Sequence, residues 1–508
     1  MGDIHLIAQS IIEWGALAVF VMLAVSLFAV LVIYFIDVTQ TAHTIRRNYP
    51  VVGRFRYFFE HMGEFFRQYF FAMDREELPF NRAERSWVYR AAKNVDATIA
   101  FGSTRPLNIE GDAIFLNSAF PDLSKDIAVP TAIVVGEGYC ENPYRTHSII
   151  NISAMSFGAI SRPAILALSN GAREAGIWLN TGEGGLSPYH LEGGCDIVYQ
   201  IGTAKYGVRN ADGSLSDEKL KDIASHTQVR MFEIKMSQGA KPGKGGILPA
   251  IKVTEEISKI RGIPQGEDSL SPNGHEDIHS VADLLDMIDR VRTVTGKPVG
   301  FKMVVGDLSF FTDLFQEIHR RGIASAPDFI TLDSADGGTG AAPQALMDYM
   351  GMPLAESLPL VVNALYVYGL RERIRIIASG KLVTPGKVAL ALAVGADFVT
   401  SARGFMFSLG CIQALQCNKN TCPTGITTHN TDLQRGLVPA DKAKRVEHYA
   451  RNIVHDVSMI AHSCGVSEPR NLERKHVRVI EFNGRTVPLE TVHPIPHVKS
   501  EYDFSTKP

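Results

Sequence analysis

Cysteine is scarce in this chain, and its scarcity excludes one class of protein. Only six cysteines occur among the 508 residues, and three of them lie within twelve residues in a C-x5-C-x4-C order. A secreted domain built on a disulfide framework carries more cysteines, at recurring spacings. Clustered free thiols instead favour metal or iron–sulfur ligation in a reducing compartment.

An excess of charge of either sign is also missing. The chain has 51 Lys and Arg residues against 54 Asp and Glu residues, a formal net charge of -3. A chain this close to neutral has no general electrostatic attraction for nucleic acid. We therefore expect no nucleic-acid partner, and the length suits one large domain with extensions.

Basic residues are missing from the N-terminal 15 residues, which contain Asp3 and Glu13 but no Lys or Arg. Residues 16–36 (ALAVFVMLAVSLFAVLVIYFI) then form an uncharged apolar run. About 20 such residues cross a bilayer as a helix, whereas a signal peptide has a basic stretch before its apolar run. We predict a single-pass anchor in the cell membrane, with a buried core helix as the alternative. Four arginines follow the run and predict a cytoplasmic catalytic domain: Arg46, Arg47, Arg54 and Arg56.

An aromatic stretch comes next, at residues 55–71 (FRYFFEHMGEFFRQYFF). Two interpretations stay open: a helix lying in the lipid headgroups, or a helix packed on the catalytic domain. We divide the chain into an anchor (1–40), a membrane-proximal lead-in (41–129), a catalytic domain (130–470) and a C-terminal tail (471–508).

From about residue 130, short β-rich runs alternate with helical patterns. Residues 280–294, for example, place five apolar side chains on one helical face. The runs predicted as strands are residues 148–154, 177–180, 196–201, 231–235, 299–304, 328–333, 374–379 and 397–401. Eight strands that alternate with helices predict an α/β fold, a (β/α)8 TIM barrel. An open doubly wound sheet is the alternative.

In such a barrel, function lies at the carboxyl ends of the strands. The loops after the last two predicted strands, residues 379–381 (SGK) and 401–404 (SARG), favour a phosphate site. Lys302 projects from the fifth strand into the mouth, where a cation would stabilise an anionic reduced flavin. Residues 235–246 (KMSQGAKPGKGG) are basic and glycine-rich but lack P-loop spacing, so a carboxylate-binding loop is more natural.

The cysteine triplet and one histidine pair suggest metals. Three thiolates suit an iron–sulfur cluster better than a four-ligand zinc site, although buried core cysteines remain an alternative. His275 and His279 match the H-E-x-x-H zinc pattern, but the predicted helix begins only after His279, with Ser280 as its N-cap. We therefore discount a zinc protease.

Several motifs resemble the FMN-binding synthase domain of glutamate synthases, in the same order. They are residues 151–161 (NISAMSFGAIS), 181–185 (TGEGG), 238–243 (QGAKPG), 301–304 (FKMV), 336–343 (DGGTGAAP) and the cysteine triplet with its following proline. The resemblance covers about residues 130–430. It implies a barrel that holds FMN beside a [3Fe-4S] cluster and reduces 2-iminoglutarate to glutamate.

The resemblance also assigns roles to individual residues. The implied cluster ligands are Cys411, Cys417 and Cys422. The implied flavin-binding residues are Met155, Ser156, Thr181, Gln238, Lys302, Gly337, Gly338, Gly380, Lys381, Arg403 and Gly404. The implied substrate-binding and catalytic residues are Lys235, Lys241, Arg261 and Lys302.

Two departures from the family pattern open the substrate question. Ile247 stands where the family usually has glutamine, and Ala282 stands where it has a glutamate that couples to the ammonia-producing domain. Nothing before residue 130 resembles a glutamine amidotransferase. We expect a dicarboxylate or amino-acid substrate, an external electron donor such as a ferredoxin or a reductase subunit, and possible use of a separate amidotransferase subunit.

Three functional hypotheses follow. The first is an FMN/[3Fe-4S] oxidoreductase that acts on CH–NH2 donors and reduces an imino acid. The second is the synthase-like subunit of an N-methylglutamate-forming transferase, a relative that shares this domain. The third is a membrane-tethered flavin/iron–sulfur electron-transfer protein without amino-acid chemistry.

Overall fold

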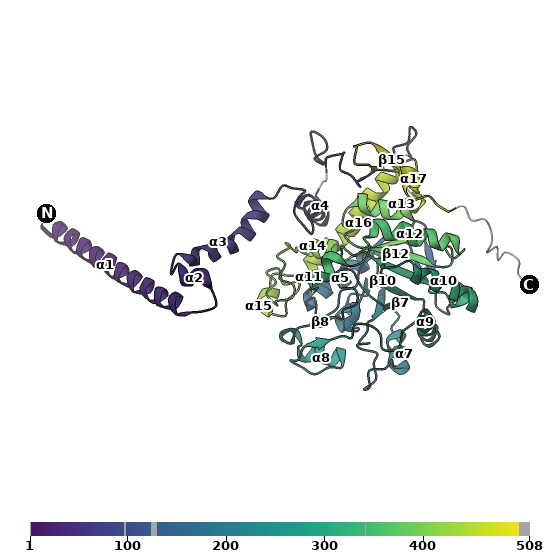
Figure 1. The fold of residues 1–508 in the computed structure, drawn as a ribbon, viewed down its shortest axis with the longest axis horizontal. Helices are drawn as coiled ribbons and strands as arrows, with labels where there is room; N and C mark the ends of the chain where they lie inside the picture. Colours follow the sequence, from purple (N-terminus) through teal and green to yellow (C-terminus); the bar gives the residue numbers. More distant parts are fainter. Residues whose placement is uncertain (1, 96–97, 123–129, 341, 497–508) are drawn as a thin grey trace, which may run out of the picture. The chain divides into compact units, whose positions relative to one another are not determined.

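The computed structural model describes residues 2–95, 98–122, 130–340 and 342–496 (Figure 1). Residues 123–129, at the end of the predicted lead-in, and the last part of the predicted tail lie outside these ranges. The chain divides into two compact units, Met1–Arg82 and Ala83–Pro508.

The first unit is helical. Helix α1 (Gly2–Thr39) contains a segment, His5–Thr39, that is long and apolar enough to cross a membrane. The helix begins earlier than residue 16 because its polar first turns also favour a helix; Gln9 bonds Glu13 one turn later at 3.3 Å. Helix α2 (Thr44–Asn48) and helix α3 (Gly53–Phe66) follow, and a π-helical turn, η1 (Arg67–Phe71), continues α3.

A buried carboxylate joins the end of α1 to the start of α3. Asp37 accepts hydrogen bonds from the Arg54 guanidinium at 2.8 Å and from the Val51 amide at 3.0 Å. Two bonds to an ionised group fix the turn between the helices more firmly than neutral bonds would. The aromatic stretch is therefore helical and attached to the apolar helix within this unit.

The second unit is built on a closed barrel of eight parallel strands. The strands are β4 (Ile150–Ile152), β5 (Leu179–Asn180), β6 (Ile197–Ile201), β7 (Val229–Lys235), β10 (Val299–Val304), β11 (Phe329–Asp333), β12 (Arg375–Ser379) and β13 (Phe398–Ser401). The barrel closes where β13 pairs with β4, with Thr400 opposite Asn151. The predicted TIM barrel is confirmed, and the open doubly wound sheet is wrong.

Helices surround the strands (Figure 1). The longer ones are α5 (Arg162–Ala175), α7 (Asp217–Ser225), α9 (Val281–Thr295), α10 (Ser309–Arg321), α12 (Leu354–Val367), α13 (Pro385–Val394), α14 (Arg403–Leu409) and α16 (Pro439–Ser463). Ser280 caps α9 by accepting a hydrogen bond from the Asp283 amide, as predicted. Helix α12 includes Pro359, and Gly369, with φ +64, follows its end.

Smaller elements cover the barrel. They are α4 (Arg82–Ala92), α6 (Pro188–Glu192), α8 (Glu255–Arg261), α11 (Gln344–Tyr349), α15 (Thr431–Gln434), α17 (Leu489–Val492) and the hairpins β2 (Ile133–Val135) with β3 (Tyr144–Thr146) and β8 (Ile247–Leu248) with β9 (Ser269–Leu270). A three-stranded sheet joins β1 (Ala113–Phe115) to β14 (Val477–Ile480) and β15 (Thr486–Pro488). Segments before and after the barrel thus share one sheet.

The amino-terminal end of the barrel is filled by apolar side chains. The cluster comprises Val135, Tyr144, Trp178, Val198, Met231, Phe329, Ile377 and Phe398. Phe329 and Phe398 are the first residues of their strands, and Tyr144 comes from the β2–β3 hairpin. This end is therefore a packed core, and the carboxyl end remains for polar chemistry.

Gly171 is expected to be essential where α5 packs on α16. A Cβ there would lie 2.5 Å from the Val446 Cβ and 2.6 Å from the Ala443 oxygen. Gly171→Ala should destabilise the protein by roughly 1–3 kcal/mol through overpacking. Gly386→Ala, in helix α13 with no atom near its Cβ position, is the control and should be neutral or slightly stabilising. Equal denaturation midpoints for the two variants would contradict this.

Candidate active site

The barrel mouth brings two lysines side by side. Lys302 in β10 is paired with Lys235 at the end of β7, so both side chains point to the same face of the sheet. Both are buried. Each has its own carboxylate: Lys235 Nζ lies 3.0 Å from Glu183 Oε2, and Lys302 Nζ lies 3.3 Å from Asp333 Oδ2.

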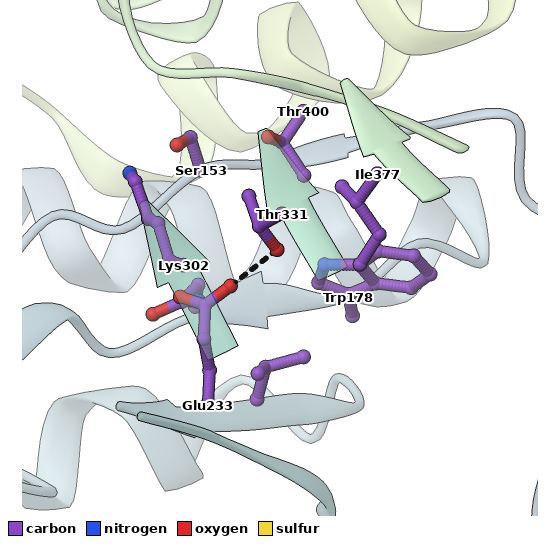
Figure 2. Close-up of a pocket in the computed structure, with 9 residues that line it drawn as sticks. Ser153, Trp178, Glu233, Lys302, Thr331, Ile377 and Thr400 are labelled. Carbon is purple, nitrogen blue, oxygen red and sulfur yellow. Dashed lines mark hydrogen bonds between the residues drawn. The ribbon is translucent and has the colours of Figure 1, made fainter. Parts of the chain in front are cut away.

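A second buried carboxylate, Glu233, lies with Lys302 in the wall of a cavity inside the barrel (Figure 2). Its oxygens accept hydrogen bonds from Thr331 at 2.6 Å, Gln200 at 2.7 Å and Asn180 at 2.9 Å. Three donors from three strands satisfy a buried carboxylate that would otherwise be costly. These three hydrogen bonds fix the position of the Glu233 carboxylate beneath the lysine.

These carboxylates keep Lys302 charged. Burial by itself lowers the pKa of the Lys302 ammonium, but Asp333, Glu233 and Glu183 outweigh it, and the net shift is upward. The barrel mouth therefore contains a permanent buried cation.

The predicted substrate cations converge on one carboxylate that the sequence analysis did not single out. Burial raises the pKa of Glu183, yet Lys235, Lys241 and Arg261 together lower it to about 2. Glycines make room for this side chain: a Cβ at Gly246 would lie 2.5 Å from Glu183 Oε1. Glu183 is accordingly ionised and surrounded by all three predicted substrate-binding cations.

Arg261 and Lys241 hold different positions in this group. Arg261 is buried, donates to the Phe157 carbonyl at 3.2 Å and to the Ser269 hydroxyl at 3.3 Å, and its Nε has no hydrogen-bond partner in the described part of the chain. Burial, together with the neighbouring Lys235, lowers the pKa of Lys241 to about 8. Lys241 is therefore the cation of the group whose charge changes near neutral pH.

Ile247 begins the β8 strand directly after Gly246, so it lies beside the Glu183 group. It is 38% exposed. Glutamine at this place could donate and accept hydrogen bonds, whereas isoleucine offers only apolar surface. The departure from the family pattern thus lies next in the chain to the predicted substrate-binding group.

The predicted flavin-binding loops pack against each other around the mouth. Thr181 and Gly182 pass over Met155 and Ser156, since a Cβ at Gly182 would lie 2.7 Å from the Ser156 amide nitrogen. Beyond β7, Gln238 precedes Gly239, where a Cβ would lie 1.9 Å from the Ser334 oxygen. The loop that includes Gly337 therefore touches the loop after β7, as only glycine permits.

The two predicted phosphate loops follow β12 and β13. Gly380 has φ +136, and Lys381 Nζ forms an ion pair with Asp336 at 3.1 Å. At the second loop a Cβ on Gly404 would lie 2.2 Å from the Tyr449 hydroxyl, and the Gly338 Cβ position lies 3.8 Å from Arg403 Nη2. Lys381, Arg403 and glycines that let the backbone approach a ligand therefore lie together at the edge where many barrels bind phosphate.

The cysteine triplet follows α14 and lies against the same loops. Arg403 Nη1 lies 3.8 Å from Cys417 Sγ, and a Cβ at Gly340 would contact the Cys417 Cβ at 3.4 Å. Burial raises the pKa of the Cys411 thiol, and Cys417 and Cys422 add to that shift because all three lie near one another. The three thiols are thus close enough for their charges to interact, although in the described part of the chain they do not converge on one point.

The surroundings of Cys422 favour its thiolate. Burial raises the pKa of this thiol, but hydrogen bonds from the Thr424 hydroxyl, at 3.3 Å, and from nearby backbone amides outweigh it and lower the pKa. The hydroxyl and the backbone of Thr427 also contribute to this lowering. Thiolates are the ligands that iron–sulfur clusters require, so this donor set fits a cluster.

The structure also bears on sites for a single metal ion. Among the residues that the structure describes, no three His, Cys, Asp or Glu side chains converge on a point that could hold one metal ion. His275 is buried, and its Nε2 bonds the Lys235 carbonyl at 3.0 Å, whereas His279 bonds its neighbour Glu276. Neither histidine lies in a helix, which agrees with the rejection of the zinc-protease pattern.

Comparison with known proteins places this site in a family. Residues 117–467 match the model of the conserved region in glutamate synthase. The chain belongs to the glutamate synthase family. It is 38% identical to the glutamate synthase large subunit-like protein YerD of Bacillus subtilis (strain 168) over 498 residues, 91% of this chain and 94% of that protein.

A second relative is matched over a smaller part of its length. The archaeal-type glutamate synthase [NADPH] of Thermotoga sp. (strain RQ2) is 34% identical over 325 residues, which cover 64% of this chain and 60% of that enzyme. The chain thus spans less than two thirds of that relative. A solved mutant chimera of (S)-mandelate dehydrogenase has a TM-score of 0.46 and 15% identity, covering 72% of this chain and 87% of that one.

Four charged residues escaped the sequence analysis: Glu183, Glu233 and Asp333 in the barrel mouth, and Lys252, whose Nζ donates to the Cys417 carbonyl at 2.7 Å. Glu183 lies in a glycine-rich motif that was noted only as a loop, and Asp333 ends a strand that was predicted. The glycine-rich motif and the strand end could have identified these two residues as candidates. Glu233 and Lys252 carry none, because an isolated charge in a strand or loop is ordinarily solvated.

Proposed function

We propose that this protein is an FMN- and [3Fe-4S]-dependent oxidoreductase that reduces an imino acid related to 2-iminoglutarate. Electrons come from an external donor, and the C=N bond of the substrate becomes an amine. The observation that carries the proposal is the group formed by Glu183, Lys235, Lys241 and Arg261 beside Lys302 in one barrel mouth.

The charge balance of this group suits a dicarboxylate. Three cations surround one carboxylate, which leaves two positive charges (3 − 1 = 2), equal and opposite to a dicarboxylate dianion. Arg261 offers a buried Nε without a partner in the described chain, and guanidinium binds carboxylate well. These residues would bind and orient the substrate.

Lys302 and the glycine loops support FMN. FMN, when bound, supplies the hydride that reduces the imine carbon. Gly380, Lys381, Arg403 and Gly404 would hold its phosphate, and Lys302 would stabilise added negative charge on its ring because the ammonium is buried and charged. Met155, Ser156, Thr181, Gln238 and Gly337–Gly338 would contact the rest.

Two measurements test the cofactors and the substrate. The purified full chain should show a flavin absorption band and the electron paramagnetic resonance signal of an oxidised three-iron cluster. The flavin-replete protein should bind 2-oxoglutarate and, once reduced, convert 2-oxoglutarate and ammonia to glutamate. Bound zinc without flavin would overturn the proposal.

A second candidate activity rests on Ile247. Its exposed apolar side chain follows Gly246, the residue that approaches Glu183, and favours an alkylated amine over ammonia, as in an N-methylglutamate-forming transferase. Incubation of the reduced protein with 2-oxoglutarate, and with methylamine and ammonia in competition, should then yield N-methylglutamate. A flavin-replete protein that binds no dicarboxylate would instead support electron transfer without amino-acid chemistry.

Location and partners complete the proposal. Helix α1 would anchor the protein in the cell membrane with its catalytic unit cytoplasmic, the side predicted by the arginines after the apolar run. A ferredoxin or reductase subunit would supply electrons, and a separate amidotransferase could supply ammonia. Fractionation without detergent tests the anchor: the full chain should be found in the membrane fraction. A soluble protein that has lost its N-terminal helix by cleavage would contradict the anchor.

Substrate binding should weaken as the pH rises through about 8. Lys241 has a lowered pKa of about 8, so its charge is present below that pH and lost above it, and the dissociation constant for 2-oxoglutarate should rise about tenfold per pH unit there. Calorimetric titration across this range measures it. Lys241→Arg, which stays charged, should flatten the profile; an unchanged profile would contradict the assignment.

A further inference from the structure

Lys252 is a buried cation beside the cysteine triplet that the proposed reaction does not use. Its side chain is 2% exposed. Its Nζ donates to the carbonyl oxygens of Cys417 and Thr427, both at 2.7 Å. It thus bridges the backbone of one predicted ligand, Cys417, and the segment that follows another, Cys422.

The surroundings of Lys252 differ from those of Lys302 and Arg292, two other buried cations. Lys302 and Arg292 each face a carboxylate, at 3.3 and 3.1 Å. Burial lowers the pKa of the Lys252 ammonium, and the neighbouring groups that oppose this shift are the thiols of Cys417 and Cys422. Burying an ammonium without a negative partner is costly, so the missing negative charge belongs at the cysteines.

An iron–sulfur cluster on three thiolates supplies that charge. It is negative when oxidised and gains one further negative charge when reduced. We propose that Lys252 stabilises the reduced cluster and so raises its reduction potential, which makes it a potential-setting residue of the electron path to the flavin. This inference rests on the proposed cluster.

Position determines how strong the effect is. Net charge, hydrogen bonds and solvent exposure set cluster potentials, and a buried unit charge is screened far less than an exposed one. Lys419 lies between the same ligands in sequence but is exposed. Lys252 should therefore shift the potential, and Lys419 should not.

The test is a redox titration of the full chain, followed by the electron paramagnetic resonance signal of the oxidised cluster. Lys252→Gln removes the charge but keeps amide donors, Lys252→Met removes both, and Lys252→Arg keeps the charge. Lys252→Gln and Lys252→Met should each lower the equilibrium constant for one-electron reduction of the cluster at least about tenfold, which lowers the reduction potential by about 59 mV. Arg and the control Lys419→Gln should stay close to the parent protein.

The outcomes separate this inference from the proposed function. A parent protein without any cluster signal refutes the cluster itself. A parent cluster with unchanged potential in Lys252→Gln and Lys252→Met overturns the role of Lys252, as does an equal shift in Lys252→Arg. If the neutral variants fold by circular dichroism but lose the cluster, its recovery in Lys252→Arg supports the charge role, and its loss there overturns it.

Discussion

Replacing Cys417 with alanine is expected to abolish the three-iron signal and to slow flavin reduction by the external donor roughly a hundredfold or more. Cys417 lies against Arg403, in a predicted phosphate loop, and against Gly340. A cluster with only two protein thiolates left is not held. Stopped-flow absorbance follows the flavin, and electron paramagnetic resonance follows the cluster.

The control for this prediction is Cys140→Ala. Cys140 is also partly buried and free, but its Sγ bonds the Gly136 carbonyl in the hairpin before the barrel. That variant should keep both signals. Cys417→Ala should still bind flavin and accept electrons from dithionite, because its barrel mouth is unchanged. Full cluster occupancy in Cys417→Ala would refute the triplet as ligand set.

Replacing Lys302 with methionine is expected to slow flavin reduction on the order of a hundredfold, the typical effect of removing one preorganised charge from a reaction site. The change leaves Asp333 and Glu233 without their shared cation. An unpaired buried charge costs roughly 3–5 kcal/mol, so stability should fall as well. Rapid mixing measures the rate, and urea denaturation measures the stability.

Lys297→Met separates the two effects. Lys297 precedes the same strand at the opposite end of the barrel, where it donates to the Ala224 carbonyl at 2.6 Å. Its loss should lower stability without changing flavin reduction. A second variant, Lys302→Met with Glu233→Gln, should recover part of the stability but none of the rate. Unchanged reduction kinetics in Lys302→Met would remove the residue from the flavin site.

The alternation of β-rich runs and helical patterns was enough to predict the barrel. Each predicted strand is present within a few residues, because buried parallel strands are nearly continuous apolar runs. Ser280 was predictable as an N-cap because capping depends on neighbouring residues alone. The first-strand motif and the cysteine spacing were likewise local, and they were sufficient to suggest the family.

The charged residues that lie together in the barrel mouth are far apart in the sequence. Glu183 lies 52 residues before Lys235 and 78 before Arg261 along the chain (235 − 183 and 261 − 183), and no spacing rule relates them. Glu233 became part of the site only because β6, β7 and β11 point Gln200, Glu233 and Thr331 into one interior. The register between strands decides which of their side chains come into contact, and that register depends on the whole barrel.

The cysteine triplet shows most clearly what local sequence can predict and what depends on the folded chain. The sequence by itself determined that three thiols lie close together near the end of an α/β pattern, since spacing within one loop limits their separation. Only the tertiary structure decided that Lys252, more than 150 residues earlier in the chain, lies buried against that loop at 2.7 Å from the Cys417 carbonyl. Burial makes that charge matter, because it removes the water that would screen it, and burial is a property of the folded chain.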